Sequence, residues 1–200
     1  MNVTALLILG LVFAALLFLG VPVAFCIGLA SVATMLLSIA VAPSVTTIAQ
    51  QVATGLNSFA LLAIPFFILA GQLMNRGGIA RRLVQFAKSI IGMVPGGLAH
   101  VNVVAAMLMG AVSGSAAAAA SAVGGFMGPQ MEKEGYDKNF SAAVNITSST
   151  TGLLIPPSNI LIVYSLAGGG LSIGALFLAG YVPGLLVGLS LMAVSAVWAY

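Results

Sequence analysis

Long apolar runs, interrupted mainly by glycine and proline, constrain this chain more than any other feature of its sequence. Residues 3–20 are almost continuous Leu, Ala, Val, Phe and Ile, enough to cross about one bilayer as a helix. Only 4% of the 200 residues are charged, whereas a soluble domain carries roughly 25%. The sequence therefore predicts an integral membrane protein. The first run lacks the basic start and small-residue cleavage site of a signal peptide, so we expect it to be retained.

Two further apolar runs follow before the first charged residue. Residues 22–41 begin with a proline, a position that helices tolerate. Residues 3–41 can form two spans or one long kinked helix, and the Gly20 and Pro22 punctuation favours two. Residues 43–58 are moderately polar and suit the membrane interface. The run Phe59–Leu73 contains Pro65, which predicts a kink.

A basic segment follows the third run. Arg76, Arg81, Arg82 and Lys88 are interleaved with apolar residues at helical spacing. This pattern predicts an amphipathic helix at the membrane surface, and its positive charge places it on the cytoplasmic side. Two interpretations stay open at this stage: a simple topology anchor, and a lever between moving parts.

Residues 96–131 contain two short legs around a polar tip. The leg Ala99–Val112 reaches only about 21 Å as a helix, which is less than the roughly 30 Å of a hydrocarbon core. Ser113-Gly114-Ser115 follows, and a second leg of small residues ends near Met131. We expect a re-entrant hairpin, because a single helix over 98–131 would be about 50 Å long and too long without extreme tilt.

The last third of the chain predicts a broken helix and one more span. Phe140–Leu166 is long enough to cross a membrane but contains Pro156-Pro157. Ala175–Tyr200 forms a final span whose Trp198 and Tyr200 suit an interface. Counting the crossings places the N-terminus outside and both hairpin ends inside, on the side of the basic segment.

The polar residues argue against an enzyme and against a resident cofactor. The chain has one His and one Cys, and all of its acidic side chains lie in residues 132–137. No carboxylate pair, metal cluster or nucleophile–base couple can form at membrane depth. We expect Cys26 to fill space and His100 to be structural rather than a proton shuttle. The few basic residues are explained by topology, so we expect no nucleic-acid partner.

Neutral oxygen atoms remain as candidate ligands at the tip and at the break. A helix broken at two prolines leaves carbonyl groups of one half and N–H groups of the other unpaired. Carbonyls with hydroxyls can hold a small hard cation, and N–H groups at a helix start can hold a carboxylate. The alternative is that each hydroxyl bonds a carbonyl one turn earlier. The polar residues concerned are Ser113, Ser115, Asn145, Thr147, Ser148, Ser149, Thr150, Thr151, Ser158 and Asn159.

Three stretches in this order resemble the large membrane subunit of tripartite ATP-independent periplasmic (TRAP) transporters. They are "LLAIPFFILAGQLMNRGGIARRLV" at 61–84, "LMGAVSGSAAAAASAVGGFMGPQM" at 108–131 and "TTGLLIPPSNILIVY" at 150–164. The similarity runs along essentially the whole chain. It implies an all-α, multi-pass protein of the bacterial inner membrane, with the fold of one inverted repeat of an elevator-type carrier of the ion-transporter superfamily.

The resemblance also implies a function and partners. The carrier would use a sodium gradient to take up an organic acid anion, such as a C4-dicarboxylate or a sialic acid. A periplasmic solute-binding protein would deliver the solute, and a small four-helix membrane subunit would be the other partner in the lipid bilayer. Residues 76–91 would form an arm helix that supports the moving domain.

The resemblance matches the tip Ser113-Gly114-Ser115 and the break from Thr150-Thr151-Gly152 to Pro157-Ser158 to the family's first cation-site region. Together with the polar residues above, it gives two expected ligand sites. Sodium is expected at Ser113, Gly114, Ser115, Ser149, Thr150, Thr151, Gly152 and Pro156. The solute is expected at Ser115, Ser158 and Asn159.

One departure from the family pattern changes what this chain can do alone. The family's large subunits carry two inverted repeats, and this chain carries one, so we expect no transport by it alone. A fragment, a truncated gene and a split subunit stay open. A binding-protein-independent sodium/dicarboxylate symporter of the same superfamily and a non-transporting membrane scaffold are the alternative functions.

The chain is expected to divide into four segments. Residues 1–58 are scaffold-like transmembrane helices with an interfacial segment, and 59–92 hold a transmembrane helix and the arm helix. Residues 93–170 resemble a transport domain with the hairpin and the broken helix, and 171–200 form the final transmembrane helix.

Overall fold

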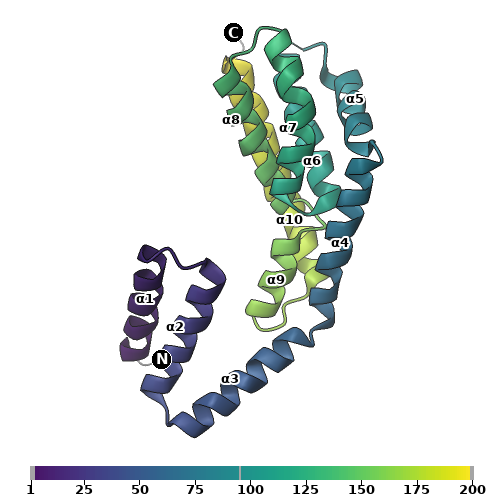
Figure 1. Cartoon of the computed structure of the whole chain (residues 1–200). Helices are drawn as coiled ribbons and strands as arrows, with labels where there is room; N and C mark the ends of the chain where they lie inside the picture. Colours follow the sequence, from purple (N-terminus) through teal and green to yellow (C-terminus); the bar gives the residue numbers. More distant parts are fainter. Residues whose placement is uncertain (1–2, 95, 199–200) are drawn as a thin grey trace. The chain divides into compact units, whose positions relative to one another are not determined.

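The computed structural model describes residues 3–94 and 96–198, and these residues form helices and turns without any strand (Figure 1). This confirms the expected all-α class. The chain divides into two compact units, Met1–Ser58 and Phe59–Tyr200. Each unit is described by itself below. The roles expected for the four segments stay predictions.

The first unit contains three helices of equal length. Helices α1 (Val3–Phe18) and α2 (Val23–Ser38) pack on one another and are joined by a turn at Gly20, whose φ is +75°. They are therefore two helices rather than one long kinked helix. Cys26 is fully buried, and its thiol donates to the carbonyl of Val21 at 3.1 Å. Helix α3 (Val41–Leu56) completes the unit.

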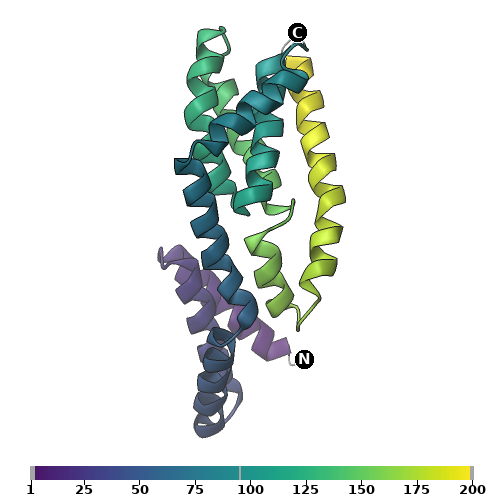
Figure 2. The ribbon, with the colours of Figure 1, turned by 90° about the vertical axis from the view of Figure 1, so that its right-hand side faces the viewer.

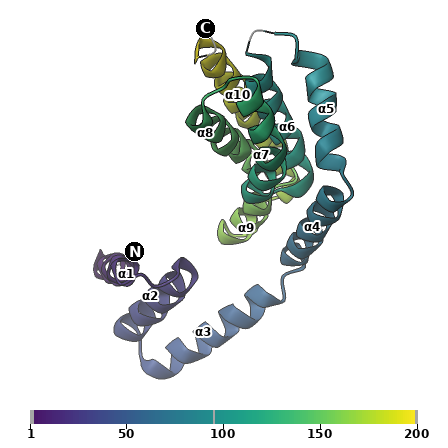
Figure 3. The same cartoon turned by 45° about the horizontal axis from the view of Figure 1, so that its top comes forward.

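The second unit begins with α4 (Phe59–Arg76) and α5 (Ile79–Ile91). Helix α4 continues through Pro65, and a left-handed Gly78 separates it from α5. The amphipathic pattern of α5 has a clear structural counterpart, because its buried stripe of Ala80, Val84 and Ala87 belongs to the core around α6. Figure 3 shows α5 alongside the hairpin helices.

The core of this unit is a helical hairpin. Helix α6 (Gly97–Ser113) turns at Gly114 into α7 (Ala116–Lys133), and the two helices pack against each other. Helix α6 has 17 residues, about 25 Å, so it is longer than the 14-residue apolar leg seen in the sequence. The turn rules out a continuous helix over 98–131. That the hairpin is re-entrant stays a prediction.

The broken segment and the last helix complete the unit. Helix α8 (Lys138–Ser149) runs into a 3₁₀ turn η1 (Thr150–Leu153), and α9 (Asn159–Ala167) follows the prolines. Figure 2 shows α9 between α4 and α10 (Ile173–Trp198), both of which it contacts.

Among the described helices, α10 alone is both long and apolar enough by itself to cross a membrane. Helices α1, α2 and α6 are apolar but shorter. Of the two aromatic residues expected at an interface, Trp198 stacks on Phe140 with ring centroids 5.1 Å apart. Tyr200 lies outside the described residues.

Candidate functional site

The tip of the hairpin is built by two serines and a glycine. Ser115 caps α7, since its Oγ accepts the N–H of Ala118 at 3.3 Å. The Ser113 hydroxyl lies 3.3 Å from the carbonyl oxygen of Ser115, to which it donates. Gly114 has a φ of +61°, and a Cβ there would lie 2.5 Å from the carbonyl oxygen of Pro157. Glycine is therefore required at the tip by both backbone conformation and space.

The break between α8 and α9 leaves several backbone polar groups of the second unit without hydrogen-bond partners among the described residues. The peptide bond Pro156-Pro157 is cis. Within the described parts of the chain, the carbonyl oxygens of residues 154–157 accept no hydrogen bond. Ser158 is fully buried and caps α9: its Oγ accepts the N–H of Leu161 at 3.3 Å and donates to the carbonyl of Leu153 at 2.6 Å. The segment therefore offers free carbonyl oxygens directly before a capped helix start.

The tip and the break meet through their backbones. The N–H of Asn159 donates to the carbonyl of Gly114 at 3.4 Å. One helical turn before the tip, Gly110 of α6 approaches Gly152 of η1 so closely that a Cβ on Gly152 would lie 2.8 Å from the Cα of Gly110. Two glycines therefore allow α6 and the broken segment to cross with almost no space between them.

The hydroxyl run that precedes the prolines divides by burial. Ser148, Ser149 and Thr151 are buried, whereas Thr147 and Thr150 are exposed. Each hydroxyl donates to a carbonyl three or four residues earlier; the pairs are Thr147–Ala143, Ser148–Asn145, Ser149–Asn145, Thr150–Thr147 and Thr151–Ser148. The back-bonding alternative is thus present at every position. A hydroxyl that donates still has lone pairs available for a cation.

The structure brings together some of the sequence-predicted residues and not others. Gly114 meets Asn159 and Pro157, while Gly152 meets Gly110 of α6. The hydroxyls of Ser113 and Ser115 make no hydrogen bond to the run 147–151. They line a cavity on the side of α4 instead. The tip and the break therefore meet through a backbone contact between Gly114 and Asn159, and the ligand roles expected for the hydroxyls stay predictions.

Sequence reasoning missed Asn102, and it did not predict the contact that Asn145 makes between helices. Asn102 of α6 is fully buried, and its Nδ2 donates to the Oγ of Ser148 at 3.1 Å. Asn145 of α8 donates to the carbonyl of Ala120 of α7 at 3.0 Å. Together they tie α8 to both hairpin legs. The available signal was a carboxamide in an otherwise apolar helix, which is costly in a membrane and needs a partner.

The single histidine is buried in α6. His100 is 5% exposed, and its Nδ1 has no hydrogen-bond partner within the described residues. No group of three or more His, Cys, Asp or Glu side chains gathers anywhere in residues 3–94 and 96–198. The ligands that the site can offer a cation are therefore neutral oxygens.

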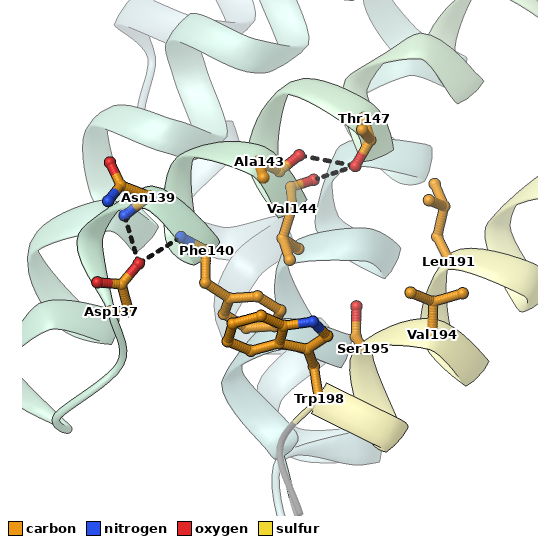
Figure 4. A pocket seen from close by; sticks show the side chains of 10 residues that line it. All are labelled: Asp137, Asn139, Phe140, Ala143, Val144, Thr147, Leu191, Val194, Ser195 and Trp198. Atoms are coloured by element: carbon orange, nitrogen blue, oxygen red, sulfur yellow. Dashed lines mark hydrogen bonds between the residues drawn. The ribbon is translucent and has the colours of Figure 1, made fainter.

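A larger cavity, of about 420 Å³, lies between α8 and α10 (Figure 4). Its lining is mostly apolar, with Phe140 and Trp198 stacked at one end. Asp137 lies at the same end, where its Oδ1 accepts the N–H groups of Asn139 and Phe140 at 2.9 Å each. Of the hydroxyl run, only Thr147 lines this cavity. It is therefore separate from the tip and the break.

Comparison with known proteins identifies the family. Residues 10–200 match the family described as the tripartite ATP-independent periplasmic transporter, DctM component. The chain belongs to this family. The resemblance seen in the three sequence stretches is thereby confirmed, and the family consists of TRAP transporter permeases rather than enzymes.

The names of several curated relatives of this TRAP permease chain specify a solute. The chain is 55% identical over 94% of its length to the uncharacterized protein YgiK of Salmonella typhimurium, of which it covers 43%. It is 40% identical to the C4-dicarboxylate large permease DctM of Rhodobacter capsulatus, with 92% and 44% of the two chains covered. It is 42% identical to the sialic acid large permease SiaM of Vibrio cholerae, with 90% and 42% covered. The chain thus spans less than half the length of these relatives.

Proposed function

We propose that this chain forms part of the large permease subunit of a sodium-coupled TRAP transporter for an organic acid anion. The relatives named as C4-dicarboxylate and sialic acid permeases support this class of solute. The single observation that carries the proposal is the contact between the hairpin tip and the helix break at Gly114 and Asn159. Discontinuous helices facing one another form the ion and solute sites of secondary transporters.

The break supplies the elements of a sodium site. Hydroxyl oxygens of Ser149 and Thr151 and free carbonyls of 154–157 lie in one short segment that contains Pro156. The remaining candidates are Ser113, Gly114, Ser115, Thr150 and Gly152. Neutral oxygens suit a monovalent cation because they need no compensating positive charge elsewhere in the membrane. In this proposal the hairpin is re-entrant and moves with the break as an elevator-type unit.

The start of α9 supplies the elements of a carboxylate site. The N–H of Asn159 donates to Gly114 and that of Leu161 to the Ser158 hydroxyl, so the N–H of Ile160 is left for an anion, which the helix dipole also favours. Ser158 and Asn159 lie at this start, and Ser115 lies at the facing tip. We assign the solute carboxylate to this position.

The partners and the location follow from the family. A small four-helix membrane subunit and a periplasmic solute-binding protein complete the transporter, which lies in the bacterial inner membrane. The N-terminus of the chain faces outside and the hairpin ends face the cytoplasm. The chain supplies one inverted repeat, and a second repeat completes the pocket in the whole permease.

The test replaces Ser113, Ser115 and Thr151 with alanine, singly and together, in the complete permease with its partner subunits. Loss of hydroxyl ligands should raise the sodium concentration for half-maximal uptake about tenfold in the triple variant, on the scale of one lost charge-assisted contact. Uptake of a radiolabelled C4-dicarboxylate at varied sodium measures this. Ser31 and Ser190 serve as controls, because their hydroxyls also bond a carbonyl one turn earlier but lie exposed. If the variants fold normally and their sodium-dependent uptake is unchanged, the assignment of these hydroxyls to a sodium site is wrong.

The two alternative functions give different results in the same assay. A symporter that needs no binding protein would take up the acid in its absence, whereas the proposed TRAP transporter requires it. A non-transporting scaffold would show no uptake in any combination of subunits.

A further inference from the structure

Helix α4 carries polar side chains only at its C-terminal end. Within its sequence FALLAIPFFILAGQLMNR, the hydrogen-bonding side chains are Gln72, Asn75 and the final Arg76. Gln72 and Asn75 are three residues apart, so they lie on one face of the helix. Polar residues at the end of a membrane helix also serve as interfacial anchors. A functional role for Gln72 and Asn75 therefore requires that this face contacts other polar groups of the protein.

That face meets the hairpin tip. Gln72 and Asn75 line a cavity of about 260 Å³ together with Ser113 and Ser115. The remaining lining residues are Ile68, Gly71 and Ala118. Gly71 brings the helix close to the tip, since a Cβ there would lie 3.0 Å from the Cβ of Ser113. Two carboxamides and two hydroxyls thus converge on one space from segments forty residues apart in the chain.

The cavity is chemically different from the break. Its lining contains no charged side chain. Carboxamides and hydroxyls can both donate and accept hydrogen bonds, so they match a group that does the same. A hydroxyl is such a group, whereas a carboxylate only accepts. Gly114 stands between the two serines of the tip in the chain, and its carbonyl accepts the N–H of Asn159 at the start of α9. The tip therefore contacts both the position suited to a carboxylate and the cavity suited to a hydroxyl.

We propose that Gln72 and Asn75 determine solute specificity by binding a hydroxyl group of the transported organic acid. This inference rests on the proposed function, because it places the carboxylate of the same solute at the start of α9. It extends that function to a helix that contributes none of the expected ligands, and it defines the solute class as hydroxylated organic acids.

The test compares two C4 acids that differ by one hydroxyl group, succinate and malate. The complete transporter is reconstituted in proteoliposomes with Gln72→Leu, Asn75→Leu and the double variant. The KM for malate should rise about fivefold in each single variant, the effect of one neutral hydrogen bond, while the KM for succinate changes less than about twofold. Asn75→Ser, which keeps a hydroxyl, should give an intermediate malate KM and guards against a folding defect in the leucine variants.

Gln85→Leu is the matched control, because Gln85 is an exposed carboxamide on α5 that does not line the cavity. Equal changes of both KM values, or no change of either, would overturn the inference while leaving the proposed function intact. Uptake of neither acid by the unmodified transporter would reject the proposed function for this class of solute, and the inference with it.

Discussion

Helices α1 and α6 have almost the same length and are both apolar, yet they have opposite environments. Helix α1 has 16 residues, none of them buried. Helix α6 has 17 residues, and most of them are buried, including His100, Asn102 and Ser113. Apolar content therefore does not separate a surface helix from a core helix in this chain. In a membrane protein the lipid-facing side is apolar too, so polar side chains and glycines mark the core.

The comparison connects packing with the proposed function. Glycines let α6 approach the broken segment, and carboxamides fix its register against α8. The same features would hold the free carbonyls of the break in place. If this is correct, small changes in α6 should have large effects, and equivalent changes on exposed helix faces should have small ones.

The largest effect is expected for Gly110→Ala. A methyl group at this position would overlap the backbone of Gly152, which cannot move aside as a side chain can. Overpacking of this kind costs about 3 kcal/mol or more, so the midpoint of unfolding should fall strongly. Unfolding of the purified chain in detergent, followed by circular dichroism, measures the change.

Gly125→Ala is the matched control for this prediction. Gly125 lies in α7 of the same hairpin, and a Cβ there would meet nothing within 4 Å. Alanine should stabilise that helix by about 0.5–1 kcal/mol through its higher helix propensity. Equal effects of the two substitutions would show that the close crossing of α6 and η1 is not a tight contact.

The next effect concerns the buried pair Asn102 and Ser148. Asn102→Leu removes the donor to the Ser148 hydroxyl and should cost about 2 kcal/mol of unfolding free energy. Adding Ser148→Ala should recover part of this loss, because the second polar partner is then also removed. The double-mutant cycle is measured by the same unfolding assay. Strict additivity of the two substitutions would contradict a direct interaction between the side chains.

How far the sequence predicted the structure depends on how local each signal was. The turn at Gly114 and the break at Pro156 were predictable, because glycine and proline limit the backbone where they occur. The pairing of Asn102 with Ser148 spans 46 residues, so the carboxamide indicates that a partner is needed but not which residue supplies it. Gln72 and Asn75 were missed for the same reason, since only the folded chain places them beside the tip.

The hydroxyl run shows a second limit of the sequence. The five consecutive polar residues from Thr147 were all candidate ligands in the sequence. A helical backbone instead distributes neighbours around its axis, so Ser148, Ser149 and Thr151 are buried and Thr150 is exposed. The transition from α8 to the 3₁₀ turn η1 sets which hydroxyls share a face. Composition alone carries no information on that transition.

The smallest predicted effect is the loss of a helix cap, which should cost less stability at an exposed cap than at a buried one. Asp137 caps α8 from an exposed position, and Ser158 caps α9 from a buried one. Asp137→Ala should cost about 1 kcal/mol, the usual loss of an N-cap. Ser158→Ala should cost about 2 kcal/mol, because the carbonyl of Leu153 also loses the donor that the buried Ser158 supplies. Asp137→Asn keeps a capping oxygen and should restore most of the loss at its site. The unfolding midpoints of the three variants rank these effects, and a cost at Asp137 as large as that at Ser158 would show that burial at the break adds nothing.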